Sequence, residues 1–465
     1  MISLQFLGAA GTVTGSKYAL TVGDSKLLID CGLFQGEKEL RARNWEPFPR
    51  PPQEFQKLLL THAHVDHSGY IPCLYRQGFR GKILTTRASQ QLCEILLPDS
   101  ARLQEEEAAY LARHGLSRHH PPQPLYSEQD AQDCLRLFEA VELGQKVKVL
   151  PGITATFHEA GHILGSAWLE LELSRNGGGK PLKLVMSGDL GREGAPIVRD
   201  PSPPVACDYM VLESTYGDRV HNPEPVGPRL AAIIQDTVKR KGILVIPAFA
   251  VERSQELLYL MESLHAAGEI ARVPVFLDSP MATQATRVFE KHRQLYDEEA
   301  SDRALLKGGL LNYKKLKFCE TISDSKAIQR AQPPFVVIAA SGMATGGRVL
   351  HHLLRYLPDP NNTVLLVGFQ AVGSRGWRLL KGEPTLRMLG EEVPVRAQVK
   401  VLDGFSGHAD YVQINQWLQR LPQAPQRIFL VHGEPASLQA QQQRISEWPG
   451  WQAYVPRYQE IVVLD

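Results

Sequence analysis

The segment Thr61-His-Ala-His-Val-Asp-His67 brings three histidines and one aspartate together in a short stretch of chain. Two histidines at positions i and i+2 after a strand point to the same side, so His62 and His64 can bind one metal ion. Asp66 and His67 can then reach a second ion nearby. Imidazole nitrogen and carboxylate oxygen both suit zinc, and manganese can substitute in such a mixed set. The spacing favours a metal site over a purely structural cluster.

Three further residues follow apolar runs in the same way, namely His162 in AGHILGS, Asp189 in MSGDLG and His432 in FLVHGE. Taken alone, His162 is better explained as a buried, hydrogen-bonded core histidine, and Asp189 is equally well explained as a turn residue. Because each follows a strand-like segment and precedes a loop, we expect these side chains to meet at one edge of the sheet structure. The seven residues together predict a centre with two metal ions.

Apolar runs that must position these side chains are Lys57–Leu60, Ile153–His158, Leu182–Met186 and Ile428–Val431, all predicted as strands. Residues 86–141 are helical in character, with breaks expected at Pro98, Gly115 and Pro121-Pro122. In the second half, strand-like and helix-like segments alternate, starting with 243–246 before a helix at 254–267. This alternation predicts a parallel α/β unit.

The composition is that of a globular protein. The 465 residues are 43% hydrophobic and 22% charged, with a net charge of +1, which excludes a disordered chain and a strongly basic coat. No apolar stretch is long enough for a membrane span, and the start of the chain lacks the pattern of a signal peptide. The six cysteines form no C-x-x-C pair, so reduced thiols and a cytoplasmic location are expected.

The motif set resembles a known family. HxHxDH, AGHILGS and SGDLG are similar to the metallo-β-lactamase fold. ESTYG at 213–217, FSGHAD at 405–410 and LVHGE at 430–434 resemble the three motifs of its β-CASP branch of RNA-processing nucleases. The resemblance covers nearly the whole chain. It implies an α/β fold in which residues 1–217 and 401–465 form an αββα sandwich of two mixed sheets. Residues 218–400 would form an inserted α/β β-CASP domain that covers the active-site cleft.

The resemblance also implies a set of seven ligands for two Zn²⁺ ions. One ion would be bound by His62, His64 and His162. The other would be bound by Asp66, His67 and His432. Asp189 would bridge both ions, with a water or hydroxide between them. Asp30 would support the histidine loop without binding metal, which is compatible with a simpler role in capping the turn Asp30-Cys-Gly32.

The chemistry that follows is hydrolysis of a phosphodiester bond. Two metal ions lower the pKa of a bound water and clamp the phosphoryl oxygens. His408 is the candidate general acid for the leaving oxygen, and Glu213 would keep it protonated. Asp189 belongs to the catalytic set as the bridging carboxylate. In the family, cleavage leaves a 5′-phosphate and a 3′-hydroxyl. The implied activity is that of an endoribonuclease on single-stranded RNA, with 5′-exonuclease activity as an optional second mode.

A glycine-rich turn is the candidate contact for RNA phosphate. Ser341-Gly342-Met-Ala-Thr-Gly-Gly-Arg348 follows an apolar strand and opens a helix, where exposed amides favour an anion. Weaker candidates for backbone contacts are Arg253, Ser374 and Arg378. Two departures from the family pattern stand here. Glu252 replaces the glycine of FA-x-GR, and Trp377 stands in the segment where GTLGR is expected.

Three alternatives remain at this stage. A small-molecule hydrolase of the same fold would not need Glu213, His408 or the large inserted unit. A DNA nuclease of the same branch tends to have an apolar residue at the third motif, so His432 favours RNA. A non-catalytic partner subunit would lose metal ligands, and this chain retains all seven. The sequence leaves the RNA target and the oligomeric state open, a homodimer included.

Overall fold

The computed structural model describes residues 1–114, 122–175, 178–307, 309, 311, 313–368, 370–371 and 373–464. The described chain forms two compact units. The first contains residues 1–195, 199–220 and 407–465, and the second contains residues 196–198 and 221–406. The domain limits expected from the sequence, 217/218 and 400/401, stay a prediction.

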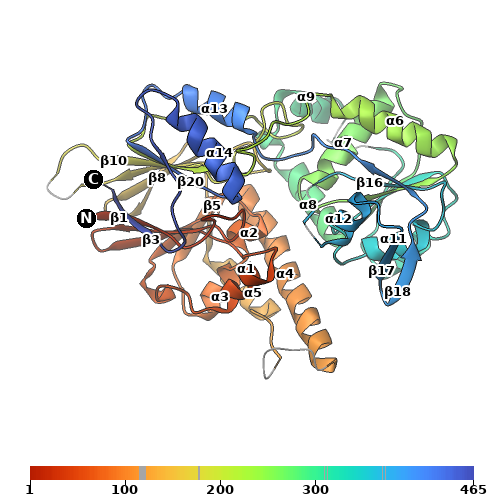
Figure 1. Ribbon diagram of the computed structural model, residues 1–465, viewed down its shortest axis with the longest axis horizontal. Helices are drawn as coiled ribbons and strands as arrows, with labels where there is room; N and C mark the ends of the chain where they lie inside the picture. Colours follow the sequence, from red (N-terminus) through yellow and green to blue (C-terminus); the bar gives the residue numbers. More distant parts are fainter. Residues whose placement is uncertain are drawn as a thin grey trace. The chain divides into compact units, whose positions relative to one another are not determined.

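The first unit is built on two seven-stranded sheets (Figure 1). In spatial order, the strands of one sheet are β22 (Ile461–Leu464), β1 (Ile2–Phe6), β2 (Lys17–Val22), β3 (Ser25–Cys31), β4 (Lys57–Leu59), β5 (Lys82–Thr86) and β6 (Phe138–Val141). Those of the other sheet are β21 (Ala453–Tyr454), β20 (Arg427–Val431), β11 (Tyr209–Glu213), β10 (Leu182–Met186), β9 (Ala167–Leu173), β8 (Ile153–Glu159) and β7 (Lys146–Leu150). Both sheets mix parallel and antiparallel neighbours.

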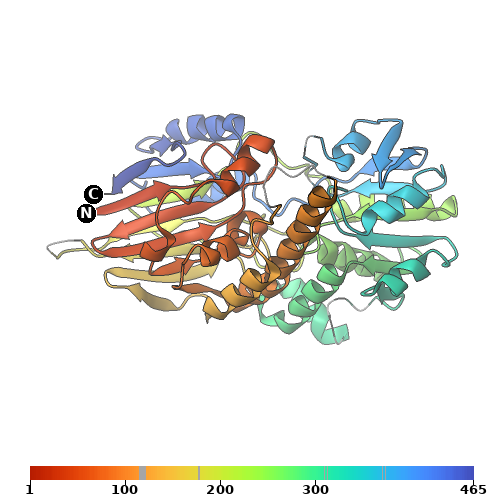
Figure 2. The ribbon, with the colours of Figure 1, turned by 90° about the horizontal axis from the view of Figure 1, so that it is seen from below.

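The two sheets enclose one hydrophobic core, in which Leu20 and Leu27 pack with Phe157 and Leu171. Helices cover the outer faces, as Figures 1 and 2 show. The helices of this unit are α1 (Lys38–Ala42), α2 (Val65–Ser68), α3 (Ile71–Arg76), α4 (Arg87–Arg113), α5 (Glu128–Cys134), α13 (Tyr411–Gln419) and α14 (Pro435–Ser446). Buried residues of α13 and α14 pack on β11 and β20, and α4 contacts β5 and β6. The expected αββα sandwich is confirmed.

Strand direction determines where the loops of the second sheet gather. β10, β11 and β20 are parallel neighbours. β8 runs antiparallel to β9, which runs antiparallel to β10, so β8 points the same way as β10. The carboxyl ends of these four strands therefore lie at one edge of the sheet.

Two expectations within residues 86–141 were wrong. Pro98 does not break the helix: α4 continues from Arg87 to Arg113. Leu97 precedes the proline and Ala101 follows it, and both are buried. A proline removes one helical hydrogen bond, and packing of the flanking residues compensates for that loss here. The breaks expected at Gly115 and Pro121 lie outside the described residues. Residues 138–141 are not helical but form β6, which pairs in parallel with β5. A run of four residues is too short for periodicity to separate helix from strand.

The second unit is a parallel sheet with helices on both faces. In spatial order its strands are β14 (Leu316–Phe318), β13 (Val275–Asp278), β15 (Phe335–Ala339), β12 (Ile243–Pro247), β16 (Thr363–Leu366) and β19 (Gln398–Val401), beside a hairpin of β17 (Thr385–Met388) and β18 (Glu391–Pro394). The helices are α6 (Val226–Lys239), α7 (Arg253–Ala266), α8 (Pro280–Lys291), α9 (Glu298–Lys307), α10 (Ile322–Ile328), α11 (Val349–Tyr356) and α12 (Arg375–Leu380). α6 and α7 pack on one face of the sheet and α11 on the other, as the alternating sequence predicts.

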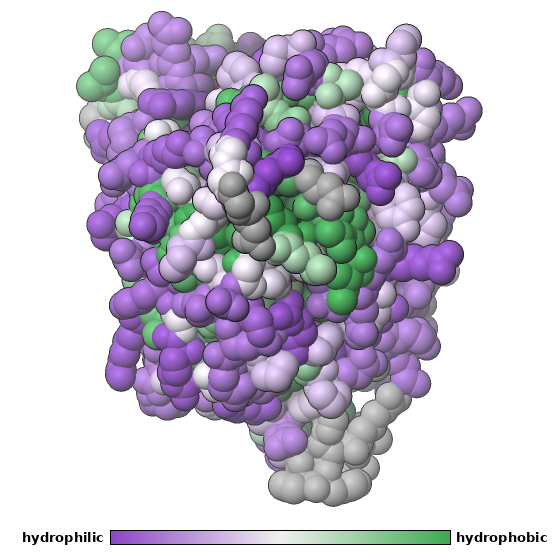
Figure 3. Space-filling model, turned by 90° about the vertical axis from the view of Figure 1, so that its left-hand side faces the viewer, coloured by the Kyte–Doolittle hydropathy of each residue, from purple (hydrophilic) through white to green (hydrophobic). Residues whose placement is uncertain are grey.

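Both chain termini lie on one face of the first unit, which is mostly hydrophilic with a hydrophobic area near its centre (Figure 3). The terminal strand β22 contributes exposed Ile461 and Val463, while Leu464 faces the core. Among the described residues, we find no helix with the length and apolar character that crossing a membrane requires.

Glu252 occupies a strained backbone conformation immediately before α7. Its φ and ψ are 68° and −64°, and the amide of Arg253 donates to the carbonyl oxygen of Val251 at 2.9 Å. These are the features of the γ-turn that is rare for residues with a Cβ atom. The related sequences are expected to have glycine here, which adopts positive φ without that strain. The departure at position 252 thus falls on a residue whose backbone favours glycine.

We expect Glu252→Gly to raise the free energy of unfolding by about 1 kcal/mol, because relief of backbone strain exceeds the added flexibility of the unfolded chain. Chemical denaturation followed by circular dichroism measures this change. Glu252→Ala is the matched control, since it removes the same side chain but keeps the Cβ atom. Equal destabilisation by both variants would show that side-chain contacts of Glu252 outweigh the strain.

A polar network crosses the outer face of strands β8, β9 and β10. The Glu170 carboxylate lies 3.2 Å from His158 Nε2 and 2.8 Å from Lys183 Nζ. The hydrogen bond from His158, opposed by partial burial and assisted by Lys183, lowers the pKa of Glu170 to about 2. A carboxylate with a lowered pKa in the folded state stabilises the protein above its unfolded-state pKa, and this contribution is lost as the pH falls through the folded value.

Replacement of Glu170 by Gln should lower the free energy of unfolding at pH 7 by about 1–2 kcal/mol, a value reduced for partial solvent screening. The difference from wild type should shrink as the pH falls from about 4.5 towards about 2. Urea titrations at several pH values test this expectation. Glu172→Gln is the control, because it makes the same charge change two residues further along β9, where the carboxylate pairs with Lys146 at 2.5 Å. A constant difference across the pH range would contradict the assigned role of Glu170.

Candidate metal centre

The loop between β4 and α2 supplies four of the predicted ligands. β4 ends at Leu59, and α2 begins at Val65, so His62 and His64 lie in the loop and Asp66 and His67 on the short helix. The loop packs directly on Gly32, where an added Cβ atom would meet the carbonyl oxygen of Asp66 at 1.6 Å. Only glycine allows this approach, which places the four side chains beside the carboxyl edge of the other sheet.

That edge supplies the remaining residues, each at the end of a strand that runs in the same direction. His162 follows β8, and Asp189 follows β10. Glu213 is the last residue of β11, and His432 comes directly after β20 with a φ of 48°. All four are at least nine-tenths buried. The shared strand direction explains why residues so far apart in sequence converge.

The ligand atoms form two groups, one of His62, His64, His162 and Asp189 and one of Asp66, His67 and His432. Asp189 also lies in a group with Glu213 and His432. In the first group, His64 Nδ1 lies 3.0 Å from His162 Nε2. His62 Nε2 and His162 Nε2 lie 3.5 and 3.6 Å from Asp189 Oδ2. This is the set that the sequence assigned to one ion.

In the second group, His67 Nε2 lies 3.3 Å from His432 Nε2, and His432 Nε2 lies 3.4 Å from Asp66 Oδ2. The other oxygen of the shared carboxylate, Asp189 Oδ1, is 3.2 Å from His67 Nε2. The structure therefore brings all seven predicted ligands together, with one oxygen of Asp189 facing each group. Their assignment as ligands stays a prediction.

The donor set fits two cations. Among the described residues, His62 Nε2 and Asp189 Oδ1 are buried without a hydrogen-bond partner. Buried polar atoms without a partner are costly, and a cation between the nitrogens and oxygens would satisfy both. Burial lowers the pKa of His62 and of His162 well below the usual value, and lowers the pKa of His64 to about 4. These imidazoles are therefore neutral at pH 7, which is the form that binds metal.

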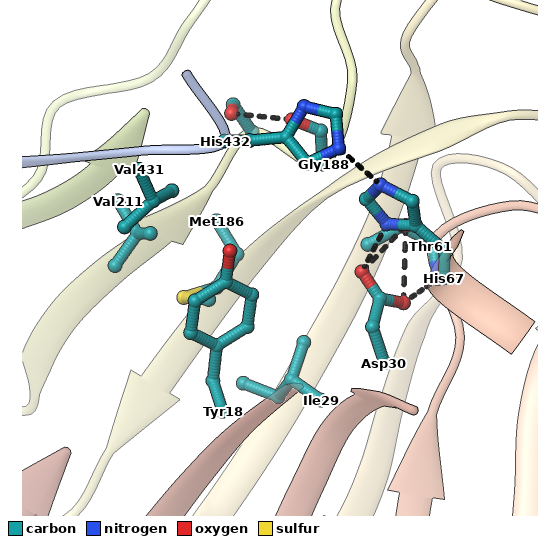
Figure 4. A pocket seen from close by; sticks show the side chains of 11 residues that line it. Tyr18, Ile29, Asp30, Thr61, His67, Met186, Gly188, Val211, Val431 and His432 are labelled. Carbon is teal, nitrogen blue, oxygen red and sulfur yellow. Dashed lines mark hydrogen bonds and ion pairs between the residues drawn. The ribbon is translucent and has the colours of Figure 1, made fainter. Parts of the chain in front are cut away.

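Asp30 lies outside the ligand set and supports it. Its Oδ2 is 2.9 Å from His67 Nδ1, and its Oδ1 accepts from the Thr61 amide at 2.8 Å. Figure 4 shows the His67 ring between Asp30 on one side and His432 on the other. A small cavity of about 10 Å³ adjoins these residues, with Tyr18 in its lining. Asp30 thus contacts the nitrogen of His67 that faces away from the metal group.

Two other partners of the histidine rings were missed by the sequence reasoning. The Thr61 hydroxyl contacts both oxygens of Asp30 and lies 3.1 Å from His62 Nδ1. Because an ionised carboxylate only accepts, Thr61 donates to Asp30 and accepts from His62 Nδ1–H. The carbonyl oxygen of Gly407 is 2.9 Å from His162 Nδ1, which must therefore carry a proton. In His62, His67 and His162, Nδ1 is held from outside and Nε2 faces the metal group. Thr61 stands within the THAHVDH segment itself, and Gly407 stands within FSGHAD, although neither segment indicates these contacts.

His408 and Glu213 form a pair beside the metal group. His408 Nδ1 lies 3.2 Å from both carboxylate oxygens of Glu213 and 3.9 Å from Asp189 Oδ2. Glu213 is fully buried and accepts from the Leu190 amide at 2.6 Å. Burial lowers the pKa of His408, but the negative charges of Glu213 and Asp189 outweigh it and raise that pKa to about 9. The pair can hold and release a proton at neutral pH.

The candidate phosphate contacts lie in the second unit and have partners within it. Arg348 donates to Asp278 Oδ1 and to the carbonyl oxygens of Cys319 and Glu320, each at 2.8 Å. Ser341 Oγ accepts from the amides of Thr345 and Gly346 at the turn, and Gly342 packs against the exposed ring of Phe249. Hence two backbone amides that were expected to donate to a phosphate donate to the Ser341 hydroxyl instead.

The weaker candidates are held in the same manner. Arg253 pairs with Glu256, and its guanidinium lies 4.9 Å from the ring centroid of Phe405. Arg378 pairs with Glu383, and Ser374 caps α12 by accepting from the Trp377 amide at 3.1 Å. A role of these residues in RNA binding stays a prediction, and it requires that their present partners be shared or exchanged.

Comparison with known proteins agrees with the motifs. Residues 254–379 match the family model of the Beta-Casp domain, and residues 392–456 match that of the Zn-dependent metallo-hydrolase RNA specificity domain. The chain is 39% identical to Ribonuclease TTHA0252 of Thermus thermophilus, over 93% of each chain. It is 31% identical to Transcription termination factor FttA of Methanosarcina mazei, over 93% of this chain and 67% of that protein.

A solved structure has the same overall fold at low sequence identity. A protein of unknown function from Enterococcus faecalis aligns over the full length of both chains with a TM-score of 0.55 and 12% identity. Identity at that level speaks for the fold alone. The motifs, the αββα sandwich and the close relatives agree, and the chain therefore belongs to the β-CASP family of RNA-processing nucleases with the metallo-β-lactamase fold.

Proposed function

We propose that the protein is a zinc-dependent endoribonuclease that cleaves single-stranded RNA and leaves 5′-phosphate and 3′-hydroxyl ends. One observation carries this proposal: five histidines and Asp66 gather with Asp189 in two groups of nitrogen and oxygen donors, beside a buried carboxylate–imidazole pair. The relative named as a ribonuclease and the match to the Zn-dependent metallo-hydrolase RNA specificity domain support RNA as the substrate. The six cysteines are free and buried, which fits the cytoplasmic location that we propose.

The metal group would be held by the seven residues of the two ligand groups. When bound, two zinc ions supply a nucleophile at neutral pH and neutralise the negative charge of the phosphate. Asp189 has one oxygen towards each group and would therefore be shared between them when metal is bound. Asp30, Thr61 and the Gly407 carbonyl hold the rings from behind, so that little reorganisation is needed during the reaction.

His408 completes the mechanism as general acid. The leaving 3′-oxygen develops negative charge as its bond to phosphorus breaks, and it needs a proton. Glu213, 3.2 Å from His408 Nδ1, stabilises the imidazolium form, in which Nε2–H would be the donor to the leaving oxygen. Since Glu213 also accepts from the Leu190 amide, its position is fixed by the strand end that bears Asp189. Removal of either residue should slow cleavage without removing the metal ions.

The first test concerns the metal. Elemental analysis of the purified protein should find two zinc ions per chain. Asp189→Ala should lose both, because its carboxylate serves both groups, and His432→Ala should lose one. His352→Ala is the matched control, since it removes a buried histidine that contacts Asp278 at 2.6 Å in the other unit. Full zinc content in Asp189→Ala would contradict the bridging role.

The second test concerns the reaction. An internally labelled single-stranded RNA should be cut at internal sites to give 5′-phosphate ends, and its DNA counterpart should remain intact. His408→Ala should reduce the rate about 10²–10⁴-fold with zinc retained, and Glu213→Gln should act in the same direction. His351→Ala, an exposed histidine of α11, provides the control. Cleavage of DNA alone would instead identify a DNA nuclease of the same branch. Hydrolysis of thioester or lactam substrates without nuclease activity would identify a small-molecule hydrolase.

A further inference from the structure

Thr215 contacts His432 at two points. It lies two residues after the end of β11, in the ESTYG segment whose glutamate was singled out from the sequence. Its Oγ1 is 3.1 Å from His432 Nδ1 and 3.2 Å from the His432 carbonyl oxygen.

The proton positions follow from counting donors. A carbonyl oxygen only accepts, so the single proton of the Thr215 hydroxyl points to the His432 carbonyl. The hydroxyl then accepts from Nδ1, which must carry a proton. The second neighbour of Nδ1 is Asp189 Oδ1 at 3.5 Å, and an ionised carboxylate also only accepts. Both neighbours thus favour the same tautomer, with hydrogen on Nδ1.

This tautomer leaves the lone pair on Nε2. His432 Nε2 lies 3.3 Å from His67 Nε2 and 3.4 Å from Asp66 Oδ2, which are the other atoms of the second ligand group. The backbone of His432 needs support as well, because its φ of 48° is unfavourable for a residue with a Cβ atom. Thr215 contacts this residue on both its ring and its carbonyl group, and the His432 amide donates to Ala9 O at 2.8 Å.

We propose that Thr215 is the positioning residue that fixes the tautomer and orientation of His432, and thereby sets the affinity of the second metal ion. This inference rests on the proposed two-metal function. The contact of Thr215 extends a pattern seen at three other rings. Nδ1 of His62 contacts Thr61, Nδ1 of His67 contacts Asp30, and Nδ1 of His162 contacts the Gly407 carbonyl oxygen. Thr215 supplies that contact for the fourth ring, which is the one contributed by the C-terminal part of the chain.

The experiment compares Thr215→Val with Thr215→Ser. Valine keeps the shape and removes the hydroxyl, whereas serine keeps the hydroxyl. Zinc affinities of both sites are measured by competition with a chromophoric chelator, without RNA. Thr215→Val should weaken the binding of one of the two ions by about 10–100-fold and leave the other unchanged, and Thr215→Ser should restore most of that loss. Thr237→Val removes a buried hydroxyl that contacts Thr363 at 2.7 Å in the other unit, and it should leave both affinities unchanged.

The thermal midpoint of the metal-free variants separates positioning from a structural role. It should be similar for Thr215→Val and Thr215→Ser. Wild-type affinities at both sites in Thr215→Val would overturn the proposal, and so would an equal loss in the valine and serine variants. A wild-type protein that binds no second zinc ion would overturn the proposed two-metal function itself. The chelator titration of the wild type therefore distinguishes failure of the function from failure of the inference.

Discussion

The burial of the Asp189 carboxylate among imidazole rings is the constraint on which the first unit depends. Asp189 is 1% exposed, and a carboxylate so far removed from water is tolerated only when opposite charges or hydrogen bonds compensate. Five histidine rings approach it, and its two oxygens face different groups of them. This arrangement requires parallel strand ends, a glycine beneath the histidine loop and a second layer of hydrogen-bond partners. Most features of the unit near this edge meet one of those needs.

The groups of candidate ligands could be predicted because their residues lie in short segments with recognisable residue types and spacing. THAHVDH joins ligand types at a strand end, and His162, Asp189 and His432 each follow an apolar run. The layers of the fold were predictable for the same reason, since strands and helices alternate in recognisable lengths. Outside these segments, prediction failed where the partner is distant or the element short. Gly407 belongs to FSGHAD, but that segment does not indicate that its carbonyl oxygen contacts His162, and β6 owes its form to pairing with β5.

The second unit shows a different limit of sequence reasoning. Arg348 and Ser341 have the residue types and loop context for binding a phosphate, and yet Arg348 donates to Asp278 and to two backbone carbonyl groups. A motif states which groups are available but not which internal partners compete for them. Glu252 illustrates the converse, because its positive φ is the conformation that the glycine expected from the family motif would adopt without strain. At position 252 the residue differs from the expected glycine, but the backbone keeps a conformation that favours glycine.

The order in which the ligands occur along the chain has a consequence for synthesis. His62 follows β4 in the first part of the chain, whereas His432 follows β20. This strand pairs with β11 in the second sheet. Synthesis proceeds from the N-terminus, so β20 can join β11 only after the whole inserted second unit has been made. Until that point a nascent chain lacks His432, and the group of side chains around Asp189 is incomplete. The predicted metal centre is therefore assembled late, after the insertion that separates its two contributing parts of the chain has been synthesised.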